Sequence, residues 1–283
     1  MSEPQPFLFS VDLEDVRTMI PDGARYAERV PVLVARYAEL LARHGVRCTF
    51  FTVGDIARRY PSLVRDLAAA GHEIACHGSD HVPLDRLDPS RFRADLERNL
   101  EDLAAAGAGE VTGFRAPVHS LTPRTAWAWE VLAELGLRYS SSVLPARHPL
   151  YGWPGFPRSA TRTTSGVWEL PLTLAGLPGL DVPFAGGVYL RVLPFALVRA
   201  CFDRELGRGR PVVGYAHPFD IDTEQERFVH PELRGRRLYH RLMYWNRRGM
   251  LGRIERLAAR GAGIVCYRDQ VERLAAGGRS RAA

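Results

Sequence analysis

Short apolar segments alternate with longer segments of helical spacing along most of the chain, and this alternation most constrains the fold. Residues 7–11, 46–53 and 263–267 are rich in aromatic and β-branched side chains, as buried strands are. Residues 24–44 place apolar side chains every three to four positions, as an amphipathic helix does. Repeated strand–helix units favour a parallel sheet with helices on its faces. We expect an α/β barrel of seven or eight strands, with an open doubly wound sheet as the alternative.

The same reading predicts the other elements and one domain. Further strands are expected at residues 71–76, 111–115, 137–140, 167–171 and 211–216, and helices at about 54–70, 88–106, 122–135, 194–206, 242–259 and 269–274. Residues 141–190 are rich in Pro, Gly and Ser and interrupt the pattern, so we expect loops that shape a substrate groove there. The predicted catalytic domain spans residues 1–275, followed by a disordered tail at 276–283.

Composition narrows the function classes. The 283 residues carry a formal net charge of +6, and all 38 basic residues are arginines. Without lysine, a lysine Schiff base or lysine general base is excluded. The arginine excess reflects either coding bias or a face that meets an anionic substrate or membrane phosphates. Residues 234–248 combine arginines with aromatic residues, but no nucleic-acid-binding motif or phosphate-binding glycine motif accompanies them, so we expect no nucleic-acid partner.

Cysteine spacing and the N-terminus bear on localisation. The four cysteines, Cys48, Cys76, Cys201 and Cys266, are far apart in sequence, which fits buried thiols in a reducing compartment better than a disulfide framework. Residues 1–6 lack the basic start and apolar core of a signal peptide, and no apolar run has the length of a membrane span. We therefore expect a cytoplasmic protein, with attachment to the inner membrane face as an additional hypothesis.

Polar residues follow several predicted strands at their carboxyl ends. Asp12 and Glu14 follow the first strand, and His77 and His81 follow the third; Arg115 and His217 follow later strands. In barrels and open parallel sheets alike, the carboxyl ends of strands form one functional rim. The sequence therefore predicts that these side chains meet.

Their chemistry fits hydrolysis of an amide or ester. His77 and His81 are four residues apart, so on a helical turn both imidazoles could bind one metal ion, with a carboxylate from Asp12, Glu14 or Asp15 as the third ligand. Asp12 and Glu14 lie on the same side of an extended chain, so one could bind metal while the other serves as general base. Arg115 could fix the base through a bidentate pair, and His217 could protonate the leaving group.

The motifs resemble those of the polysaccharide deacetylase family, carbohydrate esterase family 4. The resemblance rests on Ser10-Val11-Asp12-Leu13-Glu14-Asp15, His77-Gly78-Ser79-Asp80-His81, Arg115-Ala116-Pro117 and Tyr215-Ala216-His217-Pro218, in the family's order. It is strongest for the exosortase-associated subgroup. It implies a distorted barrel of about seven parallel strands and a divalent metal, most often Zn²⁺, with Co²⁺, Ni²⁺ or Fe²⁺ as alternatives.

The resemblance also implies roles for individual residues. Asp12 resembles the general base, His77 and His81 the metal ligands, Arg115 the residue that orients the base, and His217 the general acid. The family's adjacent aspartates are here spread into Asp-Leu-Glu-Asp, so the third metal ligand is Glu14 or, alternatively, Asp15. Asp220 is a candidate partner for His217. We also predict substrate contacts for Pro117, His119 and Trp168, of which Trp168 stands for the family's tryptophan motif.

Three functions follow as hypotheses. The first is removal of N-acetyl groups from an amino sugar in a polysaccharide, an oligosaccharide or a lipid-linked glycan precursor. The second keeps the metal site but hydrolyses a cyclic amide or imide, since the aromatic motif is unclear. The third is that the protein is a non-catalytic, carbohydrate-binding relative. The presence of a candidate residue for every catalytic role argues against this hypothesis.

Overall fold

A curled sheet of eight strands forms the centre of the molecule. The computed structural model describes residues 4–177, 181–228 and 237–280. The strand order is β6-β7-β5-β4-β3-β2-β1-β8, and within these ranges all neighbours are parallel except β6 and β7. The strands are β1 (Phe7–Leu13), β2 (Thr49–Thr52), β3 (Glu73–Cys76), β4 (Gly113–Phe114), β5 (Tyr139–Ser140), β6 (Thr161–Arg162), β7 (Trp168–Glu169) and β8 (Val212–Ala216). The predicted distorted barrel of about seven parallel strands is confirmed.

The chain after β7 partly bridges the gap between the two sides of the sheet. The backbone N–H of Thr173 donates to the carbonyl of Val213 in β8 at 3.3 Å. The N–H of Val213 in turn donates to Oγ1 of Thr173 at 2.8 Å. These bonds satisfy backbone groups that would otherwise be buried without partners. They hold the sheet as a half-barrel with an enclosed interior.

The side chains of β1 alternate between the outer face of the sheet and the interior of the half-barrel. Phe7, Phe9, Val11 and Leu13 belong to the core that packs under the helices, whereas Leu8 belongs to a second cluster inside the half-barrel. Successive side chains of a strand point to opposite faces, so Ser10 and Asp12 share the interior side with Leu8. The interior face of β1 thus changes from apolar to polar toward its carboxyl end, where the functional residues begin.

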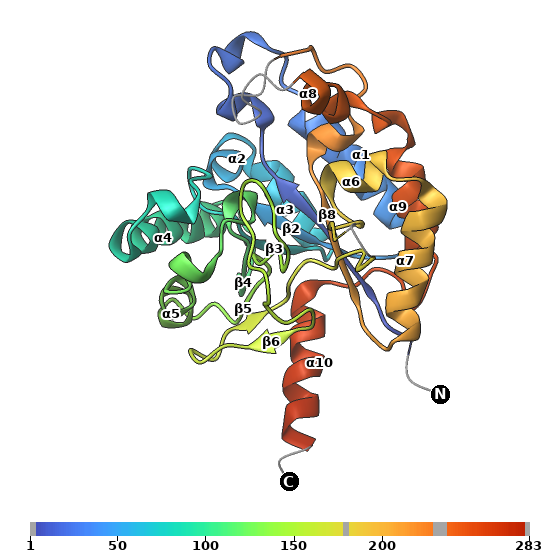
Figure 1. Ribbon diagram of the computed structural model, residues 1–283. Coiled ribbons are helices and arrows are strands. Elements are labelled where there is room, and N and C mark those ends of the chain that lie inside the picture. The colour runs from blue at the N-terminus through green and yellow to red at the C-terminus, as the bar shows by residue number, and fades with distance from the viewer. Residues whose placement is uncertain (1–3, 178–180, 229–236, 281–283) are drawn as a thin grey trace.

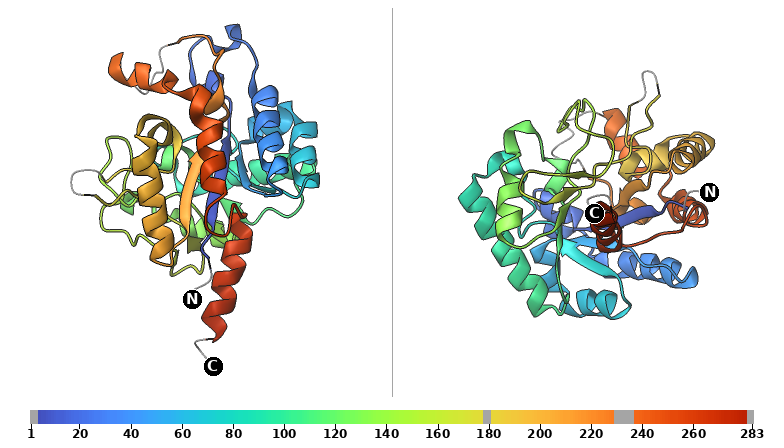
Figure 2. Two further views of the ribbon diagram at one scale, coloured as in Figure 1. Left: turned by 90° about the vertical axis from the view of Figure 1, so that its right-hand side faces the viewer. Right: turned by 90° about the horizontal axis from the view of Figure 1, so that it is seen from below.

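Helices cover the outer face of the sheet (Figures 1 and 2). The α-helices of the described residues, including α8 and α10 at the two ends of the half-barrel, are α1 (Val30–Arg43), α2 (Gly54–Arg59), α3 (Pro61–Ala69), α4 (Pro89–Ala105), α5 (Ala128–Glu134), α6 (Gly187–Val192), α7 (Phe195–Gly207), α8 (Arg237–Tyr244), α9 (Met250–Ala258) and α10 (Tyr267–Ser280). Proline in the first turn starts α1, α3 and α4, because its missing N–H would have no partner there. The carboxylate of Asp88 caps α4 by accepting from the N–H of Arg91 at 2.8 Å.

The ends of the half-barrel differ. The carboxyl ends of the long strands point upward in Figure 1, toward α8 and the chain after β1. At the opposite end, α10 starts within the core at the fully buried Tyr267 and projects away from the body (Figures 1 and 2). In the described ranges, no helix combines the length and hydropathy that crossing a bilayer requires.

Several predicted boundaries were wrong. Residues 24–29 are not part of the first helix, which begins at Val30 with Pro31 in its first turn. Residues 263–267 form no strand but one bridge, between Ile264 and Phe7. A left-handed residue, Asn246, separates α8 from α9, so residues 242–259 are not one helix.

The irregular region consists of loops with short strands, as expected, whereas the C-terminus differs from expectation. Residues 141–190 include the two-residue strands β6 and β7 and the start of α6. The helix α10 continues to Ser280, past the predicted domain end at residue 275, and residues 281–283 lie outside the described ranges. The predicted burial of all four cysteines is confirmed.

Candidate active site

Asp12 and Arg115 form a buried ion pair at the inner side of the rim. Nη1 of Arg115 lies 2.5 Å from Oδ1 of Asp12, and the side chain of Arg115 is fully buried. The other N–H groups of the guanidinium donate to Ser10 Oγ, to the carbonyl and hydroxyl oxygens of Ser141, and to the hydroxyl of Tyr267. All five donors of the guanidinium therefore have acceptors, as a buried arginine requires. This network fixes the position of the Asp12 carboxylate.

Glu14, His77 and His81 form a cluster with one potential metal-ligating atom each. These three atoms lie within 4.8 Å of one another. Oε2 of Glu14 is 2.6 Å from Nε2 of His81 and 3.5 Å from Nε2 of His77. Nδ1 of His77 contacts the carbonyl of Arg115 at 2.8 Å, so Nδ1 carries the proton and the lone pair of Nε2 faces Glu14. Two imidazoles and a carboxylate are a donor set that divalent transition metals use.

A tight loop, rather than the expected helical turn, presents the two histidines. Gly78 and His81 adopt left-handed backbone angles, with φ of 78° and 53°. Helix α4 holds the loop from below: Asn99 accepts from the N–H of His77 at 3.1 Å, and Asp95 accepts from that of Ser79 at 3.0 Å. A Cβ at Gly78 would lie 3.0 Å from Oδ2 of Asp95, so glycine suits both the angle and the space.

Asp15, the alternative third ligand, lies outside this cluster. Its carboxylate accepts from Arg17 at 2.6 Å and from Arg59 at 3.2 Å, and it caps the short 3₁₀ turn that follows β1. The structure therefore brings Glu14 to the histidines and gives Asp15 a separate, structural set of partners. This geometry favours Glu14 over Asp15 as the third ligand.

His217 lies on the side of Glu14 away from His77 and His81, and it is linked to two buried charged residues, Asp220 and Arg191. Nδ1 of His217 is 2.9 Å from Oδ2 of Asp220, and Nε of Arg191 is 2.8 Å from Oδ1 of the same carboxylate. Asp220 and Arg191 are fully buried, whereas the side chain of His217 is 19% exposed. Nε2 of His217 lies 3.9 Å from Oε1 of Glu14. Asp220 thus orients the imidazole so that Nε2 points to the cluster.

These contacts set the charges of the site. Burial opposes ionisation of Glu14, but His81, His77 and His217 outweigh it and hold its pKa well below the usual value. Burial also opposes protonation of His217, yet the hydrogen bond and charge of Asp220 raise its pKa to about 9. At neutral pH, Glu14 is therefore an anion and His217 carries a proton that it can donate.

The candidate residues line one cleft of about 210 Å³, together with mostly apolar side chains. Its lining includes Asp12, Glu14, His77, His81, His119, Leu144, Leu150, Tyr215, His217 and Met243. Past Glu14 and His81 it continues into a more polar groove of about 810 Å³, lined by Asp55, Arg58, Asp80 and Arg86. Tyr151 lines both parts and donates to Asp85 at 2.9 Å, so the loop before residue 153 lies across the groove.

The predicted substrate contacts have different positions. His119 lines the cleft; its ring lies 4.8 Å from that of Tyr215, and both its nitrogens are buried without a hydrogen-bond partner. Burial keeps the pKa of His119 well below its usual value, so the ring is neutral. Pro117 is buried behind the cleft, against the Gly78 turn.

Trp168, for which we predict a substrate contact, does not line the cleft. Trp168 lines a separate hollow with Arg138, Arg162 and Val271. Neighbouring residues in a strand face opposite sides: Trp168 packs on the interior side with Tyr139, away from the cleft, whereas Glu169 faces Trp129 of α5. Glu169 is fully buried, and its carboxylate accepts from the backbone N–H groups of Ser142 and Val143 and from Nε1 of Trp129.

Sequence reasoning missed the residues that support the site. Ser141 and Tyr267 bind Arg115, Arg191 binds Asp220, and Asp95 and Asn99 hold the histidine loop. Asp95 and Asn99 could have been recognised, because two polar residues four positions apart on the apolar face of the predicted helix at 88–106 need buried partners. Ser141, Arg191 and Tyr267 could not have been recognised from local sequence patterns, because their partners lie 26 to 152 residues away.

Comparison with known proteins places the part of the chain that holds the His77 and Arg115 motifs in a family. Residues 22–140 match the polysaccharide deacetylase family model, and residues 141–262 match a domain of unknown function, DUF3473. A chitooligosaccharide deacetylase of Sinorhizobium fredii is 35% identical over 103 residues, which are 36% of this chain and 45% of the relative. A peptidoglycan-N-acetylglucosamine deacetylase of Bacillus cereus is 29% identical over 92 residues, which are 32% and 33% of the two chains. This chain thus spans about half or less of the length of these curated relatives.

Solved structures share the fold over most of the chain. A proposed polysaccharide deacetylase from Mycobacterium smegmatis has a TM-score of 0.67 at 22% identity, covering 98% of this chain and 92% of its own. The allantoinase PuuE has a TM-score of 0.52 at 15% identity, with coverages of 84% and 82%. A carbohydrate esterase family 4 pseudoenzyme from Bacillus anthracis has a TM-score of 0.51 at 11% identity, with coverages of 95% and 66%. The family-model match thus places residues 22–140 in the polysaccharide deacetylase family, and the chain as a whole is similar to carbohydrate esterase family 4 structures in fold.

Proposed function

We propose that this protein is a metal-dependent hydrolase that removes N-acetyl groups from an amino sugar. The observation that carries the proposal is the convergence of three groups of residues on one cleft. These are the pair Asp12 and Arg115, the cluster of Glu14, His77 and His81, and the acid His217 with its partner Asp220. Together they supply a base, a metal site and an acid, which amide hydrolysis requires.

The cluster fits a divalent metal ion by its chemistry. Glu14 is held as an anion, and the hydrogen bond at Nδ1 of His77 leaves its Nε2 free to bind metal. Zn²⁺ is the ion we propose, with Co²⁺, Ni²⁺ or Fe²⁺ as alternatives of similar ligand preference. When bound, the ion would polarise the carbonyl of the amide under attack.

The protein's own residues would move the protons. Asp12 would accept a proton from the attacking water, and the ion pair with Arg115 keeps its carboxylate in one orientation. His217 would donate a proton to the leaving nitrogen from Nε2, while Asp220 holds the imidazole through Nδ1. The raised pKa of His217, about 9, keeps that proton available at neutral pH.

The groove supports a saccharide rather than a small cyclic amide as substrate. A cyclic amide would fit the apolar cleft alone, but the adjoining groove offers charged side chains that could bind sugar hydroxyls. The curated relatives with chitooligosaccharide and peptidoglycan deacetylase names are consistent with this class. Hydrolysis of a cyclic amide stays the alternative because the allantoinase shares the fold. A lipid-linked glycan substrate, the exosortase-associated subgroup and cytoplasmic localisation stay predictions.

One experiment separates these functions. Protein purified without chelators is analysed for metal, and acetate release from chitotetraose is compared with hydrolysis of allantoin. We expect bound divalent metal, acetate release that Asp12→Asn abolishes, and no allantoin hydrolysis. Allantoin hydrolysis without acetate release would favour the cyclic-amide alternative. Binding of chitotetraose without acetate release at full metal content would favour the non-catalytic one.

A further inference from the structure

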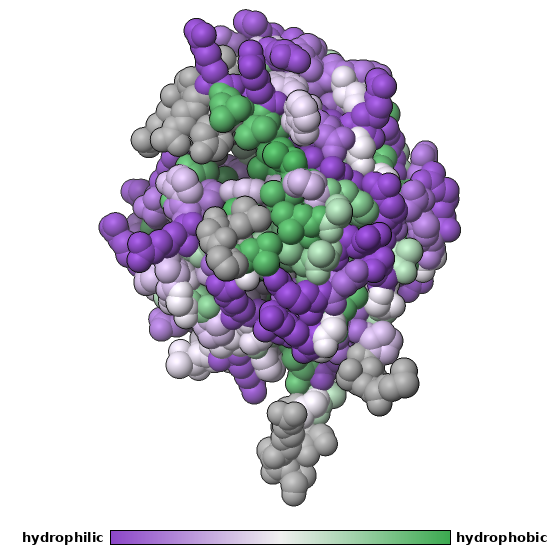
Figure 3. All heavy atoms as spheres, turned by 45° about the vertical axis from the view of Figure 1, so that its right-hand side comes forward, coloured by the Kyte–Doolittle hydropathy of each residue, from purple (hydrophilic) through white to green (hydrophobic). Residues whose placement is uncertain are grey.

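Helix α8 exposes an apolar face beside the cleft. Leu238 is 65% and Trp245 is 60% exposed, and these are the two most exposed large apolar side chains among the described residues. Leu238 lies in α8, and Trp245 follows directly after its last residue, Tyr244, so the two exposed side chains belong to one short segment. Figure 3 shows hydrophobic side chains gathered at the upper part of the molecule, where α8 lies, within a largely hydrophilic surface.

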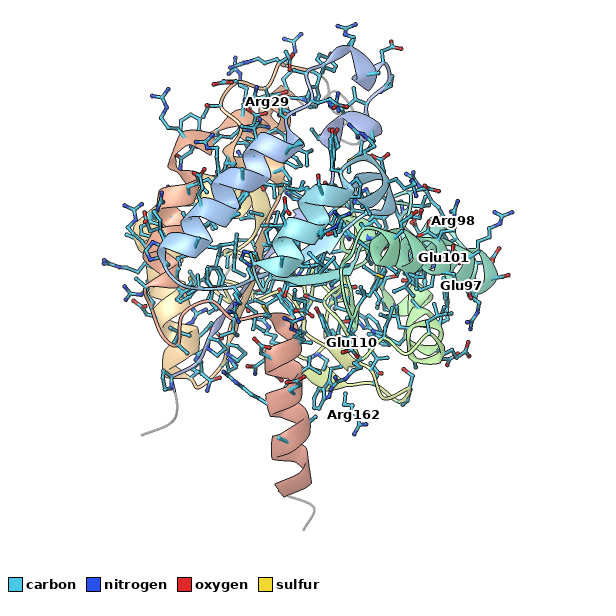
Figure 4. The ribbon with its side chains drawn as sticks, turned by 180° about the vertical axis from the view of Figure 1, so that it is seen from behind. Arg29, Glu97, Arg98, Glu101, Glu110 and Arg162 are labelled. Carbon is cyan, nitrogen blue, oxygen red and sulfur yellow. The ribbon has the colours of Figure 1, made fainter. Side chains whose placement is uncertain are left out.

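Arginines surround this apolar face. Arg237, Arg241 and Arg248 are exposed and, as far as the described residues show, form no ion pair. The surface of α4, at the flank of the molecule, is different: Glu97, Arg98 and Glu101 project together and mix both signs of charge (Figure 4). The exposed surface of α8 thus combines arginines with leucine and tryptophan, whereas that of α4 mixes both signs of charge.

The inner side of α8 is fixed to the protein, so the outer face needs no internal partner. Nη1 of Arg191 donates to the carbonyl oxygens of Leu242 and Trp245, at 3.1 and 2.7 Å. Met243 lines the cleft from this helix, and Leu150, which is 51% exposed, lines it from the loop after β5. Exposed apolar side chains thus belong to two segments that border the same cleft.

We propose that α8, through Leu238, Trp245 and the arginines around them, docks on the surface of a membrane that contains anionic lipids. Tryptophan and leucine can enter the boundary between headgroups and acyl chains, and exposed arginines attract lipid phosphates. The same arginines disfavour a second copy of this chain on this face, because like charges would meet. The proposal does not rest on the deacetylase function; if both hold, the docked cleft would open close to glycans carried on lipids.

Vesicle sedimentation tests this surface directly. The full chain is mixed with vesicles of phosphatidylcholine alone, or of phosphatidylcholine with 30% phosphatidylglycerol, at low and high salt. We expect binding to the anionic vesicles that weakens as salt rises, because surface charges are screened. Leu238→Ser with Trp245→Ser, and Arg237→Glu with Arg241→Glu, should each weaken binding about tenfold or more.

Matched controls lie elsewhere on the surface. Val32→Ser removes an apolar side chain of α1 that is 54% exposed, and Arg43→Glu with Arg91→Glu reverses two arginines that are 63% and 75% exposed. These variants should bind vesicles like the wild type, and circular dichroism should show that all variants are folded. Quenching of tryptophan fluorescence by brominated lipid should be largely lost in Trp245→Phe.

Three outcomes would overturn the proposal. They are equal binding to both vesicle types, unchanged binding of the α8 variants, and a salt-stable dimer that the α8 variants dissociate. Acetate release from soluble chitotetraose, measured without vesicles, reports the proposed function separately. A protein that releases no acetate could still bind vesicles, and a protein that releases acetate could still fail to bind them. The two measurements therefore test the two proposals independently.

Discussion

One nitrogen of Arg115, Nη1, lies 2.5 Å from Oδ1 of Asp12 and 2.6 Å from Oγ of Ser10. The strands that carry these residues are separated in the sheet by β2 and β3, so the guanidinium links distant positions across the interior of the half-barrel. The pair is therefore part of the fold and part of the site at once.

Asp12→Asn should lower both stability and activity because of this pair. Removing one partner of a buried ion pair leaves the other charge uncompensated, which costs about 3–5 kcal/mol. We expect urea unfolding to show a loss of this order, and acetate release to fall below detection. Arg162→Gln, which changes an arginine outside the cleft, is the control. An Asp12→Asn protein with wild-type unfolding would contradict the importance of the pair.

Substitutions of Glu14 and of Asp15 should have different effects on metal binding. Glu14→Gln removes the carboxylate of the cluster, whereas Asp15→Asn alters a group that binds Arg17 and Arg59. We expect zinc titration of metal-stripped protein to give weak or absent binding for Glu14→Gln and His77→Ala. Asp15→Asn should bind zinc like the wild type. The reverse pattern would restore Asp15 as the ligand.

The pKa of His217 should be about 9 in metal-free protein and should fall in Asp220→Asn, since the hydrogen bond and charge of Asp220 cause the rise. In the unfolded chain a histidine titrates near 6.5. The folded protein therefore binds the proton more tightly, so this stabilisation is complete below about pH 6.5 and is lost as the pH rises through 9. Histidine resonances followed by NMR titration measure the pKa. An unchanged value in Asp220→Asn would contradict the assignment.

The active-site motifs could be predicted from the sequence because each follows a strand. Asp12, His77, Arg115 and His217 all come at or just after strand ends, and parallel strands bring those ends to one rim. The choice of Glu14 over Asp15 could not be predicted, because it depends on which carboxylate Arg17 captures. Once that contact is known, the assignment follows.

Other features depend on packing that local patterns do not encode. Tyr267 contacts Arg115 only because the chain returns to the lower end of the half-barrel after 152 residues. Trp168 faces the interior side of β7, but it lies beside α10 at the end away from the cleft, which the local sequence pattern did not indicate. Gly186 and Gly187 leave room for the ring of Tyr215, a contact between segments far apart in the sequence.

Mild acid should destabilise the protein through His72. Its Nδ1 accepts from the N–H of Cys48 at 3.3 Å, and its ring packs edge-on against Phe50, so it is 5% exposed and must be neutral. Burial, with a smaller contribution from Arg47, lowers its pKa to about 4. Because the unfolded chain takes up the proton first, near pH 6.5, stability should fall as the pH drops from 6.5 to 4 and then level off.

The size of this effect and its control can be stated. A shift of this extent corresponds to roughly 3 kcal/mol at most. His72→Gln keeps an acceptor but does not titrate, so its unfolding free energy should depend less on pH between 4 and 6.5 than that of the wild type. His44→Gln removes a partly exposed histidine paired with Glu255 and should retain the wild-type slope through the His72 range. If His72→Gln and the wild type lose stability in parallel on acidification, the acid sensitivity does not come from His72. The variant lacks the titrating imidazole, so an unchanged slope would mean that other groups cause it.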